Sequence, residues 1–189
     1  MTVVAGASAA MTAGASAAES GAILPAMACD ALTKLDLTHL DARIASGETV
    51  TRDGHAFCDV KGSISPVTQF EALLPTSSWR GDYLQQGCGG LCGKADVSLD
   101  DPSRTSGYRA PYAPLKNGEM VVAADDQGHE APNNGDALRA RDDLRLRAVF
   151  GYSSEHQLTR TMRAVIRAFC GRKAAFSYFS GVSDGGHEA

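Results

Sequence analysis

The stretch that decides the fold is Phe176-Ser177-Tyr178-Phe179-Ser180-Gly181-Val182-Ser183-Asp184-Gly185, close to the end of the 189-residue chain. Its first half is apolar and aromatic, which predicts a strand, and a Gly-x-Ser-x-Gly motif follows at once. A strand, a glycine-flanked serine and then a helix are typical of a nucleophile elbow, a strained turn that lifts the serine hydroxyl above a sheet. Only glycine allows close packing on either side of such a turn. We therefore predict that Ser183 is a nucleophile.

Upstream of this turn, apolar periodicity predicts one clear helix and several strands. The helix covers 157–169 within 154–170 and ends at Gly171, because its apolar residues recur at helical spacing. A weaker pattern predicts helix over 138–150 and a short helix or turn over 29–40. Strands are expected over 49–60, 68–74, 79–86, 119–124 and 175–180, the first ones antiparallel, with 100–118 as loop. Strands that alternate with a long helix indicate an open α/β sheet, whose ligands bind beyond the carboxyl ends of the strands.

Two of the predicted strands end in segments that suit such a site. The strand over 79–86 runs into Gly87-Cys88-Gly89-Gly90-Leu91-Cys92-Gly93, a glycine-dense loop that exposes backbone N–H groups. The strand over 119–124 runs into Asp125-Asp126-Gln127-Gly128-His129. We expect the glycine-rich loop to supply one of the two donors that an oxyanion at Ser183 requires.

The composition allows one globular domain over 29–189 and excludes some classes of partner. The formal net charge is −4, and the sequence has no basic cluster. We therefore expect neither nucleic acid nor an anionic membrane as partner. No run approaches the roughly 20 apolar residues that a membrane-spanning helix needs. Residues 1–28 are rich in Ala, Gly and Ser and lack Lys and Arg; they are either a secretory signal without its basic region or a disordered leader.

Five cysteines, at positions 29, 58, 88, 92 and 170, favour disulfides in an oxidising compartment, so we expect a secreted or periplasmic protein. A metal site built from Cys88, Cys92 and His129 is a poor alternative because the spacing is irregular. The pair Asp125-Asp126 falls short of the six to eight oxygens that Ca²⁺ takes. We therefore predict no metal site, and interpret the acidic pair as a loop that closes a strand.

Four motifs in order resemble the tannase and feruloyl esterase family: 84–93, 126–129, 156–171 and 176–186. The resemblance covers roughly residue 29 to the end. It implies a secreted α/β-hydrolase that cleaves esters of aromatic acids, such as gallate and ferulate, with a Ser-Asp-His triad. It also implies Ser183 as nucleophile, the N–H of Asp184 as one oxyanion donor and the loop around Gly89 and Gly90 as the other.

The resemblance also implies what these residues lack. In the family the triad Asp and His, and a lid that carries calcium, lie downstream of the elbow, so we expect an α/β-hydrolase core truncated after it, without lid, C-terminal strands or cofactor. We therefore expect little or no turnover by these 189 residues. The alternative is a non-catalytic remnant or a binding module.

This sequence departs from the family pattern in two places. Val182 stands where the family usually has a cysteine bonded to one beside the catalytic histidine, and Cys170 stands where it usually has a tyrosine, which makes Cys170 the candidate for an unpaired thiol. Resemblance and proximity suggest Cys29–Cys58 and Cys88–Cys92, although four cysteines allow three pairings. Neither His187, on the helix after the elbow, nor His129, expected on the strand beside the nucleophile strand, is favoured as the base.

Overall fold

The structure is a computed structural model that describes residues 21–104, 111–136 and 138–189. The strands are β1 (Ala42–Arg52), β2 (His55–Ile64), β3 (Thr68–Pro75), β4 (Asp82–Gln86), β5 (Met120–Asp125) and β6 (Phe176–Ser180). The α-helices are α1 (Ala113–Lys116), α2 (Leu144–Ala148), α3 (Ser154–Cys170) and α4 (Asp184–His187). Short 3-10 helices are η1 (Asp30–Lys34), η2 (Thr38–Leu40) and η3 (Leu138–Ala140), and η4 (Val149–Ser153) is a π-helical turn.

The described strands form one six-stranded sheet in the order β1-β2-β3-β5-β4-β6. The pairs β1–β2, β2–β3 and β3–β5 are antiparallel, whereas β4 is parallel to both β5 and β6. The predicted mixed α/β sheet with an antiparallel beginning is therefore confirmed. Parallel pairing brings the carboxyl ends of β4, β5 and β6 to the same edge of the sheet, where the predicted site residues follow.

Turn chemistry sets the first hairpin. Asp53 and Gly54 have φ of 51° and 79°, the left-handed pair that a two-residue hairpin turn needs. β1 begins at Ala42, seven residues before the predicted start, and its register shifts between Ile44 and Ser46. The sequence signal for a strand is weak in this half. Ser46 and Glu48 are polar, and only Ala42, Ile44 and Gly47 of 42–48 are buried.

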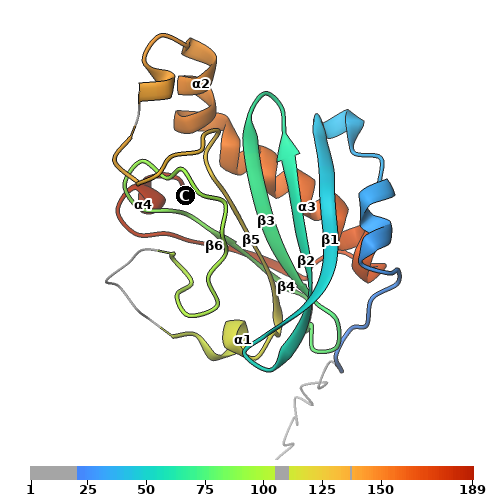
Figure 1. Ribbon diagram of the computed structural model, residues 1–189. Helices are drawn as coiled ribbons and strands as arrows, with labels where there is room; N and C mark the ends of the chain where they lie inside the picture. The colour runs from blue at the N-terminus through green and yellow to red at the C-terminus, as the bar shows by residue number, and fades with distance from the viewer. Residues whose placement is uncertain (1–20, 105–110, 137) are drawn as a thin grey trace, which may run out of the picture.

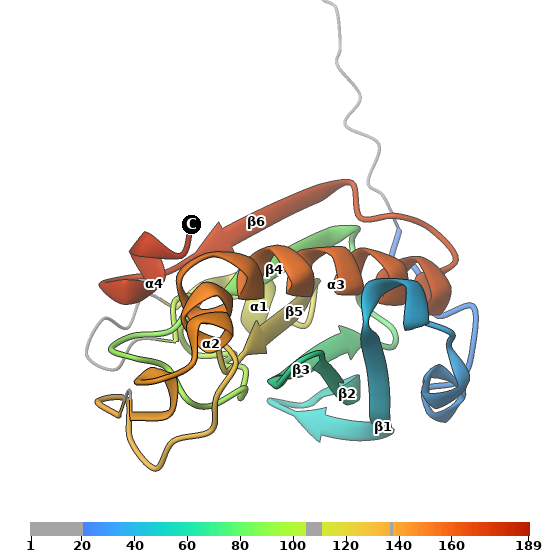
Figure 2. The same ribbon diagram turned by 90° about the horizontal axis from the view of Figure 1, so that it is seen from above.

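The central strands of the sheet are covered on both faces. Figures 1 and 2 show α3 running across one face, where its apolar side packs against β1–β5, while α1 and the loop before it lie on the other side. β5 shows both faces at once: Val121 and Ala123 belong to the core under α3, and Val122 and Ala124 to the second core with Leu115 of α1. Burial on both faces is why β5 has a continuous apolar sequence.

The helix predicted over 138–150 is wrong in its extent. The structure has η3, then α2, whose N-cap Asp143 accepts from the N–H of Arg145 at 2.8 Å, and then η4. Leu138 and Leu144 are about three-quarters exposed, so the first part of this apolar pattern has no core to pack against, whereas Val149 is buried. The helix over 154–170 is confirmed as α3, and Gly171 ends it in the left-handed conformation with φ 68°.

Residues 1–20 of the predicted leader lie outside the described residues, but its last part contacts the domain. The N–H of Ile23 donates to the carbonyl of Trp79 at 2.7 Å, and that of Ala26 donates to the carbonyl of Phe169 at 2.6 Å. Both suggested disulfides, Cys29–Cys58 and Cys88–Cys92, are present, and Cys170 is a buried free thiol. Among the described residues, no helix has the length and apolar character to cross a membrane.

Candidate active site

The turn after β6 has the backbone of a nucleophile elbow. Ser183 has φ 63° and ψ −122°, a combination that L-residues rarely adopt, and α4 begins directly after it. A Cβ on Gly181 would collide with the carbonyl group of Gly185, and one on Gly185 would lie 2.8 Å from the carbonyl oxygen of Cys88. Both glycines are therefore required by close backbone approach, and the side chain of Ser183 stays exposed.

The glycine-rich loop lies beside this turn and is held at several points. The ladder between β4 and β6 ends where the N–H of Gly87 donates to the carbonyl of Ser180 at 2.9 Å. Beyond it, the Cys88–Cys92 disulfide closes the loop. Gly90 has φ 66°, and a Cβ there would lie 2.5 Å from the carbonyl oxygen of Asn134. These contacts fix a tight loop whose backbone is exposed to the site.

A cavity of about 620 Å³ joins the two segments, since Ser183, Gly89 and Gly90 all line it. The structure thus brings together three of the four residues predicted for the site. Asp184 lines a neighbouring cavity of about 350 Å³. Its backbone N–H, the predicted donor, is the first amide of α4 and so has no acceptor within the helix.

The wall of the larger cavity comes from 94–104, of which the sequence analysis predicted only 100–104, as loop. Gln86, the buried last residue of β4, donates through Nε2 to the carbonyls of Ser98 at 2.9 Å and Asp101 at 3.0 Å, and accepts from the N–H of Ser98 at 2.9 Å. Arg104 donates to the carbonyl of Asp125 at 3.2 Å. The sequence signal that could have indicated this wall is a polar glutamine at the end of a predicted strand.

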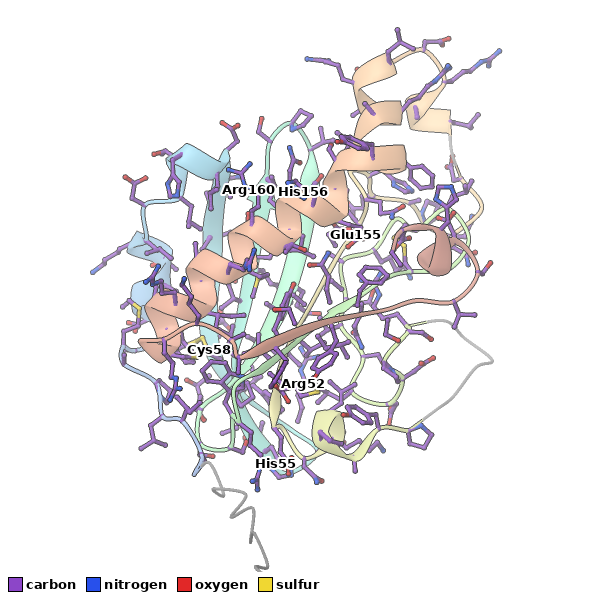
Figure 3. The ribbon with its side chains drawn as sticks, turned by 180° about the vertical axis from the view of Figure 1, so that it is seen from behind. Arg52, His55, Cys58, Glu155, His156 and Arg160 are labelled. Atoms are coloured by element: carbon purple, nitrogen blue, oxygen red, sulfur yellow. A yellow bond between two sulfur atoms is a disulfide. The ribbon has the colours of Figure 1, made fainter. Side chains whose placement is uncertain are left out.

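A chain of carboxyl groups lies behind the elbow. Asp125, the last residue of β5, accepts from the Ser154 hydroxyl at 2.7 Å. Glu155 of α3 accepts from the side-chain amide of Gln85 and is hydrogen-bonded to Glu188, just after α4. Figure 3 shows Glu155 at the end of α3 that lies toward α4. Three elements of the fold therefore meet through one buried and two half-buried acids, a feature for which the sequence analysis had no prediction beyond Asp125.

Burial dominates the ionisation of these groups. It raises the pKa of Asp125 and, helped by the charges of Asp125 and Glu188, raises that of Glu155 well above its usual value. Burial also raises the pKa of Glu188 to about 7, against the N–H of Cys88, which lowers it. The three close carboxyl groups therefore oppose one another's ionisation.

Asp126 forms the loop closure that the sequence suggested. Its Oδ1 accepts from the N–H groups of Gln69 at 3.0 Å and Gly128 at 2.9 Å, which ties the end of β5 to β3. Burial raises the pKa of Asp126 to about 7. The acidic pair is thus part of the framework of the strand end.

No histidine among the described residues lines the cavity that contains Ser183. His187 lines the smaller cavity, together with Asp184 and Glu188. The prediction that His129 follows the strand next to the nucleophile strand is wrong, because β4 lies between β5 and β6. His129 instead packs edge-on against Phe150, with ring centroids 6.3 Å apart.

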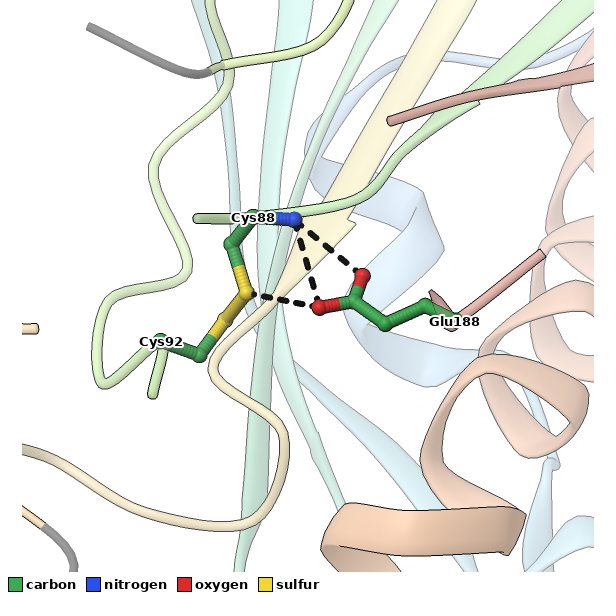
Figure 4. A group of neighbouring side chains, drawn as sticks. All are labelled: Cys88, Cys92 and Glu188. Atoms are coloured by element: carbon green, nitrogen blue, oxygen red, sulfur yellow. Dashed lines mark hydrogen bonds between the residues drawn. A yellow bond between two sulfur atoms is a disulfide. The ribbon is translucent and has the colours of Figure 1, made fainter. Parts of the chain in front are cut away.

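Within the described part of the chain, Cys88, Cys92 and Glu188 form a group that resembles a metal site, with one ligand atom from each within 4.8 Å of the others (Figure 4). The two sulfur atoms are bonded to each other. Metals bind the thiolate form of cysteine, so the disulfide removes two of the three ligands. The alternative set with His129 in place of Glu188 has the same disadvantage.

Comparison with known proteins relates the chain to esterases. The tannase and feruloyl esterase family profile matches residues 49–189. An uncharacterized esterase of Agrobacterium fabrum is 29% identical over 78% of this chain, and the mono(2-hydroxyethyl) terephthalate hydrolase of Piscinibacter sakaiensis is 30% identical over 78%. A solved structure of feruloyl esterase B from Aspergillus oryzae superposes on 84% of the chain with a TM-score of 0.64 at 24% identity, which supports the fold.

The chain spans only part of these proteins: 27% and 26% of the two curated relatives and 32% of the solved feruloyl esterase chain. The part shared with the solved feruloyl esterase is the mixed α/β sheet. Since the family profile covers well over half of this chain, the protein belongs to the tannase and feruloyl esterase family.

Proposed function

We propose that the protein is a carboxylic ester hydrolase for esters of aromatic acids, and that Ser183 forms the acyl-enzyme. The observation that carries the proposal is the left-handed backbone of Ser183, held by Gly181 and Gly185 beside the Gly89–Gly90 loop in one cavity. Such strain persists only where the surrounding structure enforces it, and it concentrates at functional sites. Family membership and the esterase relatives support the reaction class.

In the proposed reaction, Oγ of Ser183 attacks the ester carbonyl carbon and loses its proton to a base. The N–H of Asp184 and the amides around Gly89 and Gly90 stabilise the oxyanion, each lowering the barrier by on the order of 3 kcal/mol. The alcohol then leaves, and water hydrolyses the acyl-serine. The proposal assigns the base and its acid partner to the part of the family fold that this chain does not span, and needs no cofactor from the described residues.

The aromatic acid is the finer part of the proposal. It rests on the family, whose description names tannase and feruloyl esterase, and on relatives whose names specify ferulate and terephthalate esters. The two disulfides support a secreted or periplasmic location, since such bonds persist in oxidising compartments.

A burst experiment on the purified chain tests the proposal. With p-nitrophenyl acetate we expect release of about one equivalent of p-nitrophenolate per chain followed by little turnover, because an oxyanion hole and binding alone leave a residual acceleration of roughly 10³–10⁴. Ser183→Ala abolishes the burst, and Ser180→Ala, at the end of β6, preserves it. A burst that survives in Ser183→Ala, or no burst in the folded chain, favours the non-catalytic alternative.

A further inference from the structure

Glu188 links the segment after the nucleophile to the loop before it. Its carboxylate lies against the N–H of Cys88, with Oε2 at 3.1 Å and Oε1 at 3.4 Å from the nitrogen, and Oε1 is 3.1 Å from Cys88 Sγ (Figure 4). Its own N–H donates to the carbonyl of Asp184 at 3.0 Å, which closes α4. One residue thus joins α4 to the amide that precedes Gly89.

This contact continues the sheet where the ladder stops. The N–H of Gly87 is the last to reach β6, through the carbonyl of Ser180, and the next amide along the chain, that of Cys88, reaches Glu188 instead. The direction of the loop as it leaves β4 therefore depends on an acceptor carried by the elbow helix.

The packing leaves this acceptor little freedom. A Cβ on Gly87 would lie 2.7 Å from Oε2 of Glu188 and 2.9 Å from Cα of Gly185, so the carboxylate fills the space between the two backbones. Glu155 of α3 is hydrogen-bonded to it. Asp125 of β5 and Asp184 of α4 face it as charges, and His187 lines the same cavity. The carboxylate is thus held by the Cys88 N–H and by close backbone packing, against the repulsion of two neighbouring acids.

We propose that Glu188 is a positioning residue that fixes the 87–92 loop, which carries the proposed oxyanion donors, relative to Ser183. This inference rests on the proposed function, since a fixed loop matters for catalysis only if an oxyanion forms there. Donors must sit within about 0.5 Å of the productive position, so a loop released at Cys88 loses stabilisation without losing the nucleophile.

Two conservative variants separate the effect of side-chain length at position 188 from the effect of its charge. Glu188→Gln keeps an oxygen acceptor at the same distance and removes the charge, whereas Glu188→Asp keeps the charge and withdraws the acceptor by one methylene. Hydrogen–deuterium exchange of the full-length chain measures the amides of 87–92, with the β5 peptide as internal reference. Glu48→Ala on the exposed face of β1 is the control substitution.

We expect exchange at the Cys88 amide to quicken roughly tenfold or more in Glu188→Asp, and to stay within about threefold of wild type in Glu188→Gln and Glu48→Ala. Unchanged exchange in Glu188→Asp, or equal loosening in Glu188→Gln, overturns the positioning role. Because β5 exchange reports global unfolding, a variant that fails to fold is recognised, and the remaining one still decides the question.

The acylation rate provides the functional readout. We expect the rate constant of the p-nitrophenolate burst to fall at least about tenfold in Glu188→Asp and to remain near wild type in Glu188→Gln, with similar half-saturating ester concentrations in all three. A change in half-saturation alone contradicts positioning. If the wild-type chain gives no burst, the proposed function fails, while the exchange result still establishes whether Glu188 holds the loop.

Discussion

Replacement of Ser183 by glycine and by alanine measures the strain stored in the elbow. Both variants lack the hydroxyl, so their difference isolates the cost of a Cβ at φ 63° and ψ −122°. Such a conformation costs a non-glycine residue about 1–3 kcal/mol, and the freer unfolded chain of a glycine variant returns about 0.4–1 kcal/mol of that. We therefore expect Ser183→Gly to be more stable than Ser183→Ala by about 1 kcal/mol.

Urea unfolding followed by fluorescence of Trp79, which is fully buried, gives the two free energies of unfolding, and the melting temperatures should differ by about 2–4 °C. The matched control is Ser177, exposed in the middle of β6, where the order reverses and glycine is less stable than alanine by about 0.5–1 kcal/mol. If glycine is no more stable than alanine at position 183 while the control behaves as expected, the elbow is not strained and the reasoning fails.

Three other predictions concern the framework of the site. Gly181→Ala forces a Cβ into the carbonyl of Gly185 and should lower the free energy of unfolding by about 1–3 kcal/mol in urea titrations, whereas Gly21→Ala, with open space around it, should change little. Because burial raises the pKa of Asp126 to about 7, the folded state holds a proton between about pH 4 and 7, and the stability it provides is lost as the pH rises through 7. Asp126→Asn should therefore raise the free energy of unfolding at pH 8 by on the order of 2 kcal/mol and change it little at pH 4; an equal effect at both pH values contradicts the assignment. Removal of the Cys29–Cys58 bond, which closes a 29-residue separation, should cost about 3.5 kcal/mol of stability by calorimetry, and no loss would show that other contacts hold this end.

Local signals in the sequence were sufficient for the centre of the fold. The apolar period of 157–169, the turn pair Asp53-Gly54 and the continuous apolar run of 119–124 each have one stable arrangement, and the structure confirms all three. The start of β1 and the broken helix over 138–153 escaped prediction because tertiary packing decides them. In the first, pairing with β2 supports a largely exposed sequence; in the second, Leu138 and Leu144 find no core.

The candidate site also contains residues that local motifs could identify and residues that they could not. Ser183, Gly89 and Gly90 could be found from motifs, because glycine at a close backbone approach leaves a trace in the sequence. The strand order that separates His129 from β6 could not, since nothing local determines which strands become neighbours. Glu188 was missed for a similar reason: its partner Cys88 lies 100 residues away, and a glutamate after a short helix is ordinarily a solvated residue.

The most direct measurement of the central claim is the location of the acyl group after brief exposure of the chain to p-nitrophenyl acetate. Acid quenching, proteolysis and tandem mass spectrometry assign the added acetyl group to a residue. The account predicts a single adduct on Ser183, absent from Ser183→Ala and retained in Ser180→Ala. Acetylation spread over surface lysines such as Lys94, with Ser183 unmodified in the folded wild-type chain, would contradict it.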